Sequence, residues 1–327
     1  MILHENKQLF KDLILAASQS IEAGGLGIKR EFIEKDYWIT RSLKLLSDSD
    51  AEHIAIFKGG TSLSKVYGIG ARFSEDIDIA IREAATLSDN QLKKVLTKTM
   101  HNMSQGLEEI EIPGKTKKSS KYRKQYFRYE QVLPSEYESG INKGQILIEI
   151  NSFANPYPFE IKSISSFAYE FLRQRNPAMV AQFGLEPFNI AVLDIKRTFT
   201  EKMVSLFRYS LADEHIKNLG AKIRHFYDLH FLLKEQSIKD YLSSVEFIRD
   251  FQDLFNEDQE RFDYPTGWQS KKLTDSPLIT DTASVWSQVE NIYTNELPFL
   301  AYRQVPNPEE ILSSLHEIVS YVKSDNQ

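Results

Sequence analysis

Cysteine is absent from all 327 residues, so the chain has no disulfide bonds, no thiolate nucleophile and no cysteine ligands for zinc. No apolar run approaches the roughly 18 residues that cross a membrane, and the N-terminal sequence lacks the basic, apolar and small-residue regions of a signal peptide. The formal net charge is -6, which argues against a generally basic surface for nucleic acid. We therefore expect a cytoplasmic protein with no membrane partner.

The periodicity of apolar residues changes along the chain. Strand-like segments cover residues 53–57, 75–81, 121–130 and 145–153. Helical patterns cover 5–23, 30–46 and 89–105, and then 194–210, 222–235, 238–256, 284–295 and 307–324. This order predicts an α/β (α+β) fold in which a mixed sheet with flanking helices precedes a helical C-terminal domain. We place the first domain, with its N-terminal helices, at 1–170 and the mostly helical domain at 171–327.

Two acids stand one residue apart inside the apolar strand EDIDIAI. Side chains alternate across a strand, so Asp76 and Asp78 share a face, and Glu149 occupies the polar face of the strand QILIEINSF. If these strands are neighbours, the three acids converge, and Mg²⁺ or Mn²⁺ would neutralise them. Such ions can clamp the attacking and leaving oxygens of a phosphoryl transfer. The alternative is a solvated sheet face with Glu149 paired to a lysine.

The segment Gly59-Gly60-Thr61-Ser62 lies between a strand and a short helix. Glycine lets a backbone approach a ligand closely, and N–H groups at a helix start attract phosphate. Thr61 or Ser62 can donate a hydroxyl to the same phosphates, and Lys65 is within reach one turn later unless it is simply solvated. The Walker A pattern is absent, so this would be a different kind of phosphate-binding turn.

A glycine-hydroxyl turn followed by a strand with Asp-x-Asp resembles the DNA polymerase β-like nucleotidyltransferase fold. The wording KGGTSLSK…RFSEDIDI is similar, more narrowly, to the AbiEii/AbiGii toxin family, the toxins of AbiE-type (type IV) toxin–antitoxin and phage-defence systems. The blocks IEKDYWITRSLKLL, RTFTEKMVSLF and IRHFYDLHFLL extend the resemblance over about residues 31–233.

The resemblance implies roles for individual residues. Gly60 and Ser62 would hold nucleotide phosphates, and Asp76 and Asp78 would bind metal. Lys202 matches the helical lysine of the family and would stabilise the triphosphate, while Asp228 matches its late aspartate. Glu149 corresponds to the third strand acid of the wider fold.

Helix geometry adds further expectations. Arg224 and Asp228 are four residues apart and face the same side. They form either a surface ion pair or a site in which Asp228 orients Lys202 or the acceptor hydroxyl and Arg224 contacts phosphate. Lys202 is otherwise a lysine at a helix edge with its head in solvent. We also expect Lys35 or Asp36 to contact and support residues of the active site; the alternative is that this segment only packs through Tyr37 and Trp38.

The stretch KTKKSSKYRKQYFRYE, residues 115–130, interleaves basic and aromatic residues. Such a mixture can grip phosphates and stack bases, which makes it a candidate surface for an RNA acceptor. The alternative is a solvated loop that leads into a core strand.

Together these features predict a metal-dependent nucleotidyltransferase toxin that uses NTP and Mg²⁺ or Mn²⁺. Some relatives modify tRNA 3′ ends, so the resemblance makes tRNA the first candidate acceptor, and it implies a separately encoded antitoxin as a partner. Two alternatives stay open at this point: a catalytically silent protein that binds nucleotide or RNA, and a metal-dependent nuclease.

Overall fold

The computed structural model describes residues 1–133 and 144–323. In it, short strands rich in β-branched residues pair into a mixed sheet. Within those residues the sheet has 8 strands in the order β3-β5-β6-β2-β1-β8-β7, and β4 pairs with β5. The pairs β2–β6 and β1–β8 are parallel, and the other pairs are antiparallel. The strands are β1 (Ala55–Lys58), β2 (Asp76–Ile81), β3 (Glu108–Ile110), β4 (Lys117–Lys118), β5 (Tyr122–Arg128), β6 (Gln145–Asn151), β7 (Phe159–Ile164) and β8 (Phe188–Leu193).

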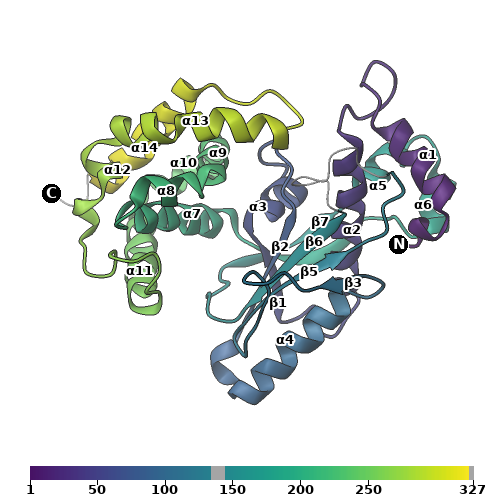
Figure 1. The fold of residues 1–327 in the computed structure, drawn as a ribbon, viewed down its shortest axis with the longest axis horizontal. Coiled ribbons are helices and arrows are strands. Elements are labelled where there is room, and N and C mark those ends of the chain that lie inside the picture. Colours follow the sequence, from purple (N-terminus) through teal and green to yellow (C-terminus); the bar gives the residue numbers. More distant parts are fainter. Residues whose placement is uncertain (134–143, 324–327) are drawn as a thin grey trace. The chain divides into compact units, whose positions relative to one another are not determined.

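One face of the sheet is buried under two helices, α2 (Arg30–Ser47) and α4 (Asp89–Met103) (Figure 1). The isoleucines of β2 and β6 on this face are fully buried: Ile77, Ile79, Ile148 and Ile150. Arg123 of β5 shares the face and donates a hydrogen bond to Thr97 of α4 at 2.7 Å. Ser88 precedes α4 and forms a capping box with Gln91, which explains why the helix begins at Asp89.

The described chain divides into two compact units, residues 1–68 with 73–193 and residues 69–72 with the chain from 194 onward. The first unit holds the sheet with its helices: α1 (Lys7–Ala17), α2, α3 (Gly59–Ser62), the π-helical turn η2 (Leu63–Tyr67), α4, α5 (Phe167–Leu172) and α6 (Pro177–Phe183). The second is helical: α7 (Ile195–Ser210), α8 (His215–Gly220), α9 (Ile223–Leu232), α10 (Gln236–Leu242), α11 (Val245–Arg261), α12 (Pro277–Thr280), α13 (Thr282–Leu300) and α14 (Pro308–Lys323).

The predicted fold class, a mixed sheet with flanking helices and a helical C-terminal region, is confirmed. The division after residue 193 comes later than the expected domain boundary at 170, because β7 and β8 extend the sheet beyond β1. The helix expected at 238–256 is interrupted near Ser243, where α10 ends and α11 begins. Of the helices in the described ranges, none has the length and apolar character to cross a membrane.

Glu34 is a buried acid on α2, only 2% exposed, and its Oε1 accepts a hydrogen bond from the backbone N–H of Val132 at 2.7 Å. Burial raises the pKa of Glu34 to about 7, although this hydrogen bond opposes the shift. The folded protein therefore keeps a proton that the unfolded chain releases, and this contribution to stability is lost as the pH rises through about 7.

We expect Glu34→Gln to be more stable than the wild type by about 1–2 kcal/mol at alkaline pH, because glutamine has no charge to desolvate there. The difference should vanish in mild acid, where Glu34 is protonated in both states. Urea unfolding across this pH range measures it, with Glu52→Gln, an exposed acid of the same unit, as the control. A difference that is independent of pH would contradict the assignment.

Candidate active site

Asp76 and Asp78 lie on the face of β2 opposite to the one that α2 and α4 cover, because Ile77 and Ile79 alternate with them. Asp78 is the register partner of Glu149 on the parallel strand β6. All three acids are half-buried. The structure thus brings these acids to one face of adjacent strands, where the sequence pattern predicted them.

Gly59 joins this face to the start of α3. Its φ of 84° lies in the left-handed region, and a Cβ placed on it would lie well under 3.0 Å from Oδ2 of Asp78. The carboxylate of Asp78 therefore packs directly against the backbone of the diglycine turn. Glycine is needed at this position for its conformation and for the close approach of the acid.

We expect Gly59→Ala to lower kcat/KM by about 100-fold, because the new methyl group must push the Asp78 carboxylate aside. Gly68→Ala is the matched control: Gly68 also has a positive φ, 66°, but an added Cβ there meets nothing within 4 Å. Steady-state kinetics of both variants separate displacement of Asp78 from backbone strain. Equal activities would show that the contact with Asp78 is unimportant.

The two hydroxyl residues of the turn are deeply buried, with Thr61 1% and Ser62 0% exposed. Thr61 donates to the backbone carbonyl of Asp76, and Ser62 donates to the carbonyl of Gly59 at 2.9 Å. These bonds fix the turn to β2 and to itself. The contact of Gly60, Thr61 and Ser62 with phosphate stays a prediction, and the buried hydroxyls favour backbone N–H groups as its donors.

Glu149 has two close partners on β5. Lys124 Nζ lies 2.6 Å from Oε1 of Glu149, and the Tyr122 hydroxyl donates to Oε2 at 2.5 Å. Burial and, second, the contact with Glu149 raise the pKa of Tyr122. The Tyr122 hydroxyl therefore stays protonated and donates a hydrogen bond to Glu149. Both oxygens of the third acid are thus engaged by donors from the neighbouring strand.

Asp76 and Asp78 fit a divalent ion. Carboxylate oxygens are the hard ligands that Mg²⁺ and Mn²⁺ prefer. The Asp78 carboxylate occupies the space beside the Gly59 backbone that any side chain at position 59 would fill. Glu149 fits this role less well because of its two donors. No group of three His, Asp or Glu side chains suited to a metal ion occurs within the described ranges.

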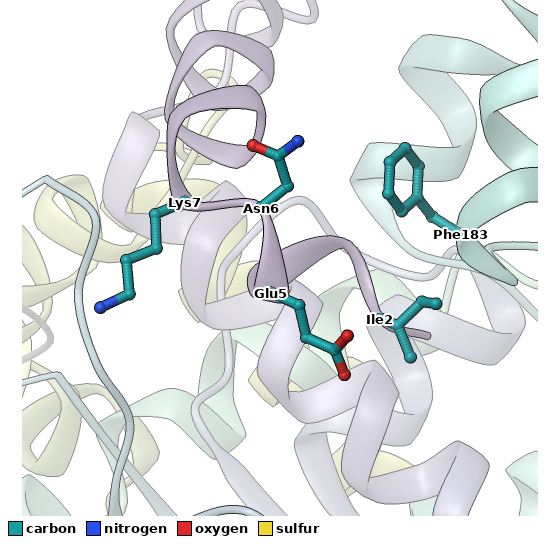
Figure 2. A pocket seen from close by; sticks show the side chains of 5 residues that line it. All are labelled: Ile2, Glu5, Asn6, Lys7 and Phe183. Atoms are coloured by element: carbon teal, nitrogen blue, oxygen red, sulfur yellow. The ribbon is translucent and has the colours of Figure 1, made fainter.

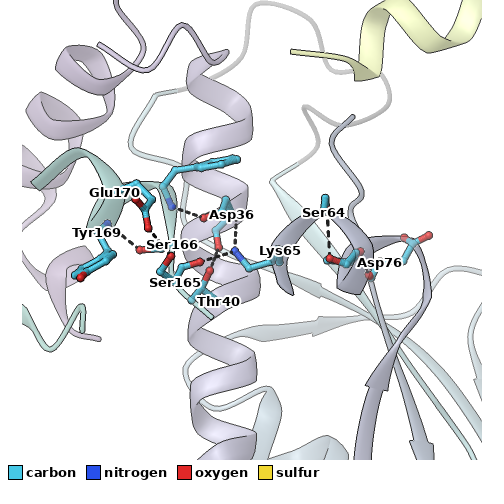
Figure 3. Close-up of polar contacts among 11 residues, drawn as sticks. Asp36, Thr40, Ser64, Lys65, Asp76, Ser165, Ser166, Tyr169 and Glu170 are labelled. Carbon is cyan, nitrogen blue, oxygen red and sulfur yellow. Dashed lines mark hydrogen bonds and ion pairs between the residues drawn. The ribbon is translucent and has the colours of Figure 1, made fainter. Parts of the chain in front are cut away.

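Asp36 and Lys65 connect α2 to the turn helix (Figure 3). Lys65 Nζ donates to Oδ1 of Asp36 and, at 3.1 Å, to the carbonyl of Ser165. The other carboxylate oxygen of Asp36 accepts the N–H of Phe167 at 2.8 Å. Lys65 therefore braces the turn, and its predicted contact with phosphate stays a prediction.

Lys35 makes the second connection from α2. It is 1% exposed, and its Nζ lies 2.7 Å from Oε2 of Glu75, the residue before Asp76. Lys35 thus contacts Glu75, next to the start of β2, and Asp36 contacts Lys65 of η2. These contacts support the expectation that Lys35 and Asp36 of α2 hold neighbouring residues of the site in place.

We expect Asp36→Ala to cost about 3 kcal/mol of stability, because it leaves a buried ammonium and the Phe167 N–H without their acceptor. We also expect KM for NTP to rise about tenfold as the turn loosens, with Asp36→Asn restoring part of it through the Phe167 bond. Asp48→Ala, which removes an exposed pair at the end of the same helix, should change neither. Urea unfolding and steady-state kinetics test this, and an unchanged KM would contradict the brace.

Lys202 and Asp228 form an ion pair within the helical unit. Lys202 Nζ of α7 lies 2.8 Å from Oδ2 of Asp228 on α9, and both side chains are buried. Arg72 completes the group, since its Nε and Nη2 donate to the two oxygens of Asp228 at 2.7 Å each. Burial alone would raise the pKa of Asp228, but Arg72 and Lys202 hold it below its usual range.

Sequence reasoning missed Arg72 because its partner is 156 residues away and no local pattern connects them. Lys202 and Asp228 are in contact, and the orienting role of Asp228 in the reaction stays a prediction. The contacts of Lys202 and Arg224 with phosphate stay predictions, and Arg224 is half-buried on α9.

The basic stretch 115–130 is largely neutralised by nearby acids. Four of its cations have acidic partners, in the pairs Lys118–Glu109, Lys121–Asp89, Lys124–Glu149 and Arg128–Glu108. Phe127 and Tyr129 are buried, with Tyr129 stacked on Trp38, whereas Tyr126 is half-buried on the face of the acids. These contacts weaken the interpretation of the whole stretch as an RNA surface. Compared with Phe127 and Tyr129, Tyr126 is better placed to stack on a base, because it lies on the face of the acids.

A hollow of about 570 Å³ lies between the N-terminal segment and Phe183 of α6 (Figure 2). Its lining includes one acid, Glu5, and one base, Lys7, which pairs with Glu130. None of the residues predicted for catalysis lines it, so it is not the candidate active site.

The sequence model of one protein family, the nucleotidyl transferase AbiEii toxins of type IV toxin–antitoxin systems, matches residues 41–294. Among solved structures, the nucleotidyltransferase toxin MenT4 of Mycobacterium tuberculosis is similar, with 14% identity and a TM-score of 0.47 over 95% of this chain and 98% of that one. A search of curated proteins found no match. The family match confirms the resemblance seen in the motifs: the chain belongs to the family of AbiEii nucleotidyl transferase toxins of type IV toxin–antitoxin systems, and it is a nucleotidyltransferase.

Proposed function

We propose that this enzyme transfers a nucleotidyl group from a ribonucleoside triphosphate to an RNA hydroxyl, with tRNA as the first candidate acceptor, and that it requires Mg²⁺ or Mn²⁺ on Asp76 and Asp78. The observation that carries the proposal is the packing of the Asp78 carboxylate against Gly59 of the diglycine turn. This contact supports the proposal because Asp78, the acid proposed to hold the metal ion, lies beside the backbone that would receive the phosphates.

In the proposed reaction the acceptor oxygen bonds to the α-phosphorus, the bond from this phosphorus to the bridging oxygen breaks, and pyrophosphate leaves. The acceptor proton passes to water. A bound divalent ion would supply positive charge for the phosphate oxygens and lower the pKa of the acceptor hydroxyl. Gly59 and Gly60 would present the backbone to the phosphates, and Thr61 would keep the turn fixed to β2.

The biological setting also belongs to the proposal. As a toxin of its family, the protein would arrest growth in the cytoplasm by modifying RNA, as part of phage defence, and a separately encoded antitoxin would counteract it. Lys202 would stabilise the triphosphate and Asp228 would orient Lys202, as the observed ion pair between them supports.

The test is to incubate the protein with total RNA, Mg²⁺ and each α-labelled NTP in turn, beside Asp76→Ala. We expect label on a discrete RNA of tRNA size with the wild type and none with the variant. RNA shortened without NTP would indicate a nuclease instead, and Mg²⁺-dependent NTP binding without pyrophosphate release would indicate a silent binding protein. Label on protein alone would move the acceptor from RNA to protein.

A further inference from the structure

Glu149, the third acid of the site, already forms an ion pair with a lysine, Lys124. Lys124 Nζ is 2.6 Å from Oε1 of Glu149, and the two side chains are 26% and 21% exposed, so solvent screens this pair only in part. Tyr122 occupies the other oxygen at 2.5 Å. A metal ion that used Glu149 as a ligand would have to displace at least one of these donors.

The register of the strands places this cation next to the metal-binding acids. Lys124 of β5 is opposite Glu149 of β6, and Glu149 is opposite Asp78 of β2. Neighbouring strands are about 4.8 Å apart, and the three residues share one face of the sheet. A second divalent ion on Glu149 would therefore stand within a few ångströms of a half-buried ammonium, and their repulsion would be large.

We propose that the site loads one divalent ion, held by Asp76 and Asp78, and that the ammonium of Lys124 takes the place of a second. Glu149 is then a positioning residue for Lys124 instead of a metal ligand. An ammonium has three N–H donors, and Glu149 uses one of them, so Lys124 can also donate to an oxygen of the substrate. This inference rests on the proposed function, because it assumes the ion on Asp76 and Asp78.

The experiment counts Mn²⁺ by electron paramagnetic resonance. The protein is saturated with the α,β-methylene analogues of the ribonucleoside triphosphates in turn, and the complex is separated by rapid gel filtration before counting. We expect one ion per chain in the wild type and the same count in Glu149→Gln. Lys124→Met should bind a second ion, because Glu149 loses its cation. Lys118→Met removes a lysine–glutamate pair of the same 2.6 Å length, between Lys118 of β4 and Glu109 of β3, and should leave the count at one.

Two ions in the wild type that fall to one in Glu149→Gln would overturn the inference and leave the proposed function standing. A count that stays at one in a folded Lys124→Met variant would also contradict the role of Lys124. No ion in the wild type would contradict the proposed function itself and this inference with it. Circular dichroism checks the fold of each variant, and Glu149→Gln keeps the test decisive if Lys124→Met does not fold.

Discussion

Asp78→Asn should lower nucleotidyl transfer by about a thousandfold or more, because an amide cannot supply the negative charge that a divalent ion requires. Asparagine has nearly the same shape as aspartate, so it still packs against Gly59 and keeps the close contact with the turn. We therefore expect the melting temperature to stay within a few degrees of the wild type, which separates loss of chemistry from loss of fold.

The measurement is initial-rate transfer of α-labelled NTP, with the melting temperature recorded on the same preparations. Glu160→Gln is the control, since Glu160 is an acid of the same sheet, 40% exposed on β7 and paired with Lys162. We expect full activity from it. If Asp78→Asn retained a tenth of the wild-type rate, Asp78 would not be a metal ligand.

The acid face and the turn could be predicted from the sequence because both depend on local pattern. Alternation alone put Asp76, Asp78 and Glu149 on the polar faces of their strands. The glycine-hydroxyl motif located the turn, and the register that makes β2 and β6 neighbours then brought the acids together.

Long-range partners could not be predicted in the same way. Lys65 has the reach to contact phosphate, and only the position of α2 shows that Asp36 holds it instead. β8 was missed because its residues, FNIAVL, form a short apolar run with no alternation, which is typical of a strand buried by its neighbours and ambiguous in a sequence. Arg72 gave no signal for a comparable reason, since its meaning depends on a carboxylate on α9.

Removal of the Asp228 carboxylate, the distant partner of Arg72, has the largest expected effect on stability. We expect Asp228→Asn to cost about 3–5 kcal/mol, because it leaves Arg72 and Lys202 buried without a counter-charge. Since the pKa of Asp228 is held below its usual range, the stabilisation is complete at neutral pH and is lost only as the pH falls through that lowered pKa. The difference between wild type and variant should therefore stay constant from neutral pH into mild acid and shrink only in strong acid.

Urea unfolding followed by tryptophan fluorescence measures this effect, because Trp268 and Trp286 are buried in the helical unit that holds Asp228. Glu214→Gln is the control: it removes an exposed ion pair with Lys217 at 2.7 Å in the same unit, and we expect no measurable change. If Asp228→Asn unfolded at the urea concentration of the wild type, solvent would be compensating the two cations. The group of Arg72, Lys202 and Asp228 would then be more open to solvent than its buried side chains indicate.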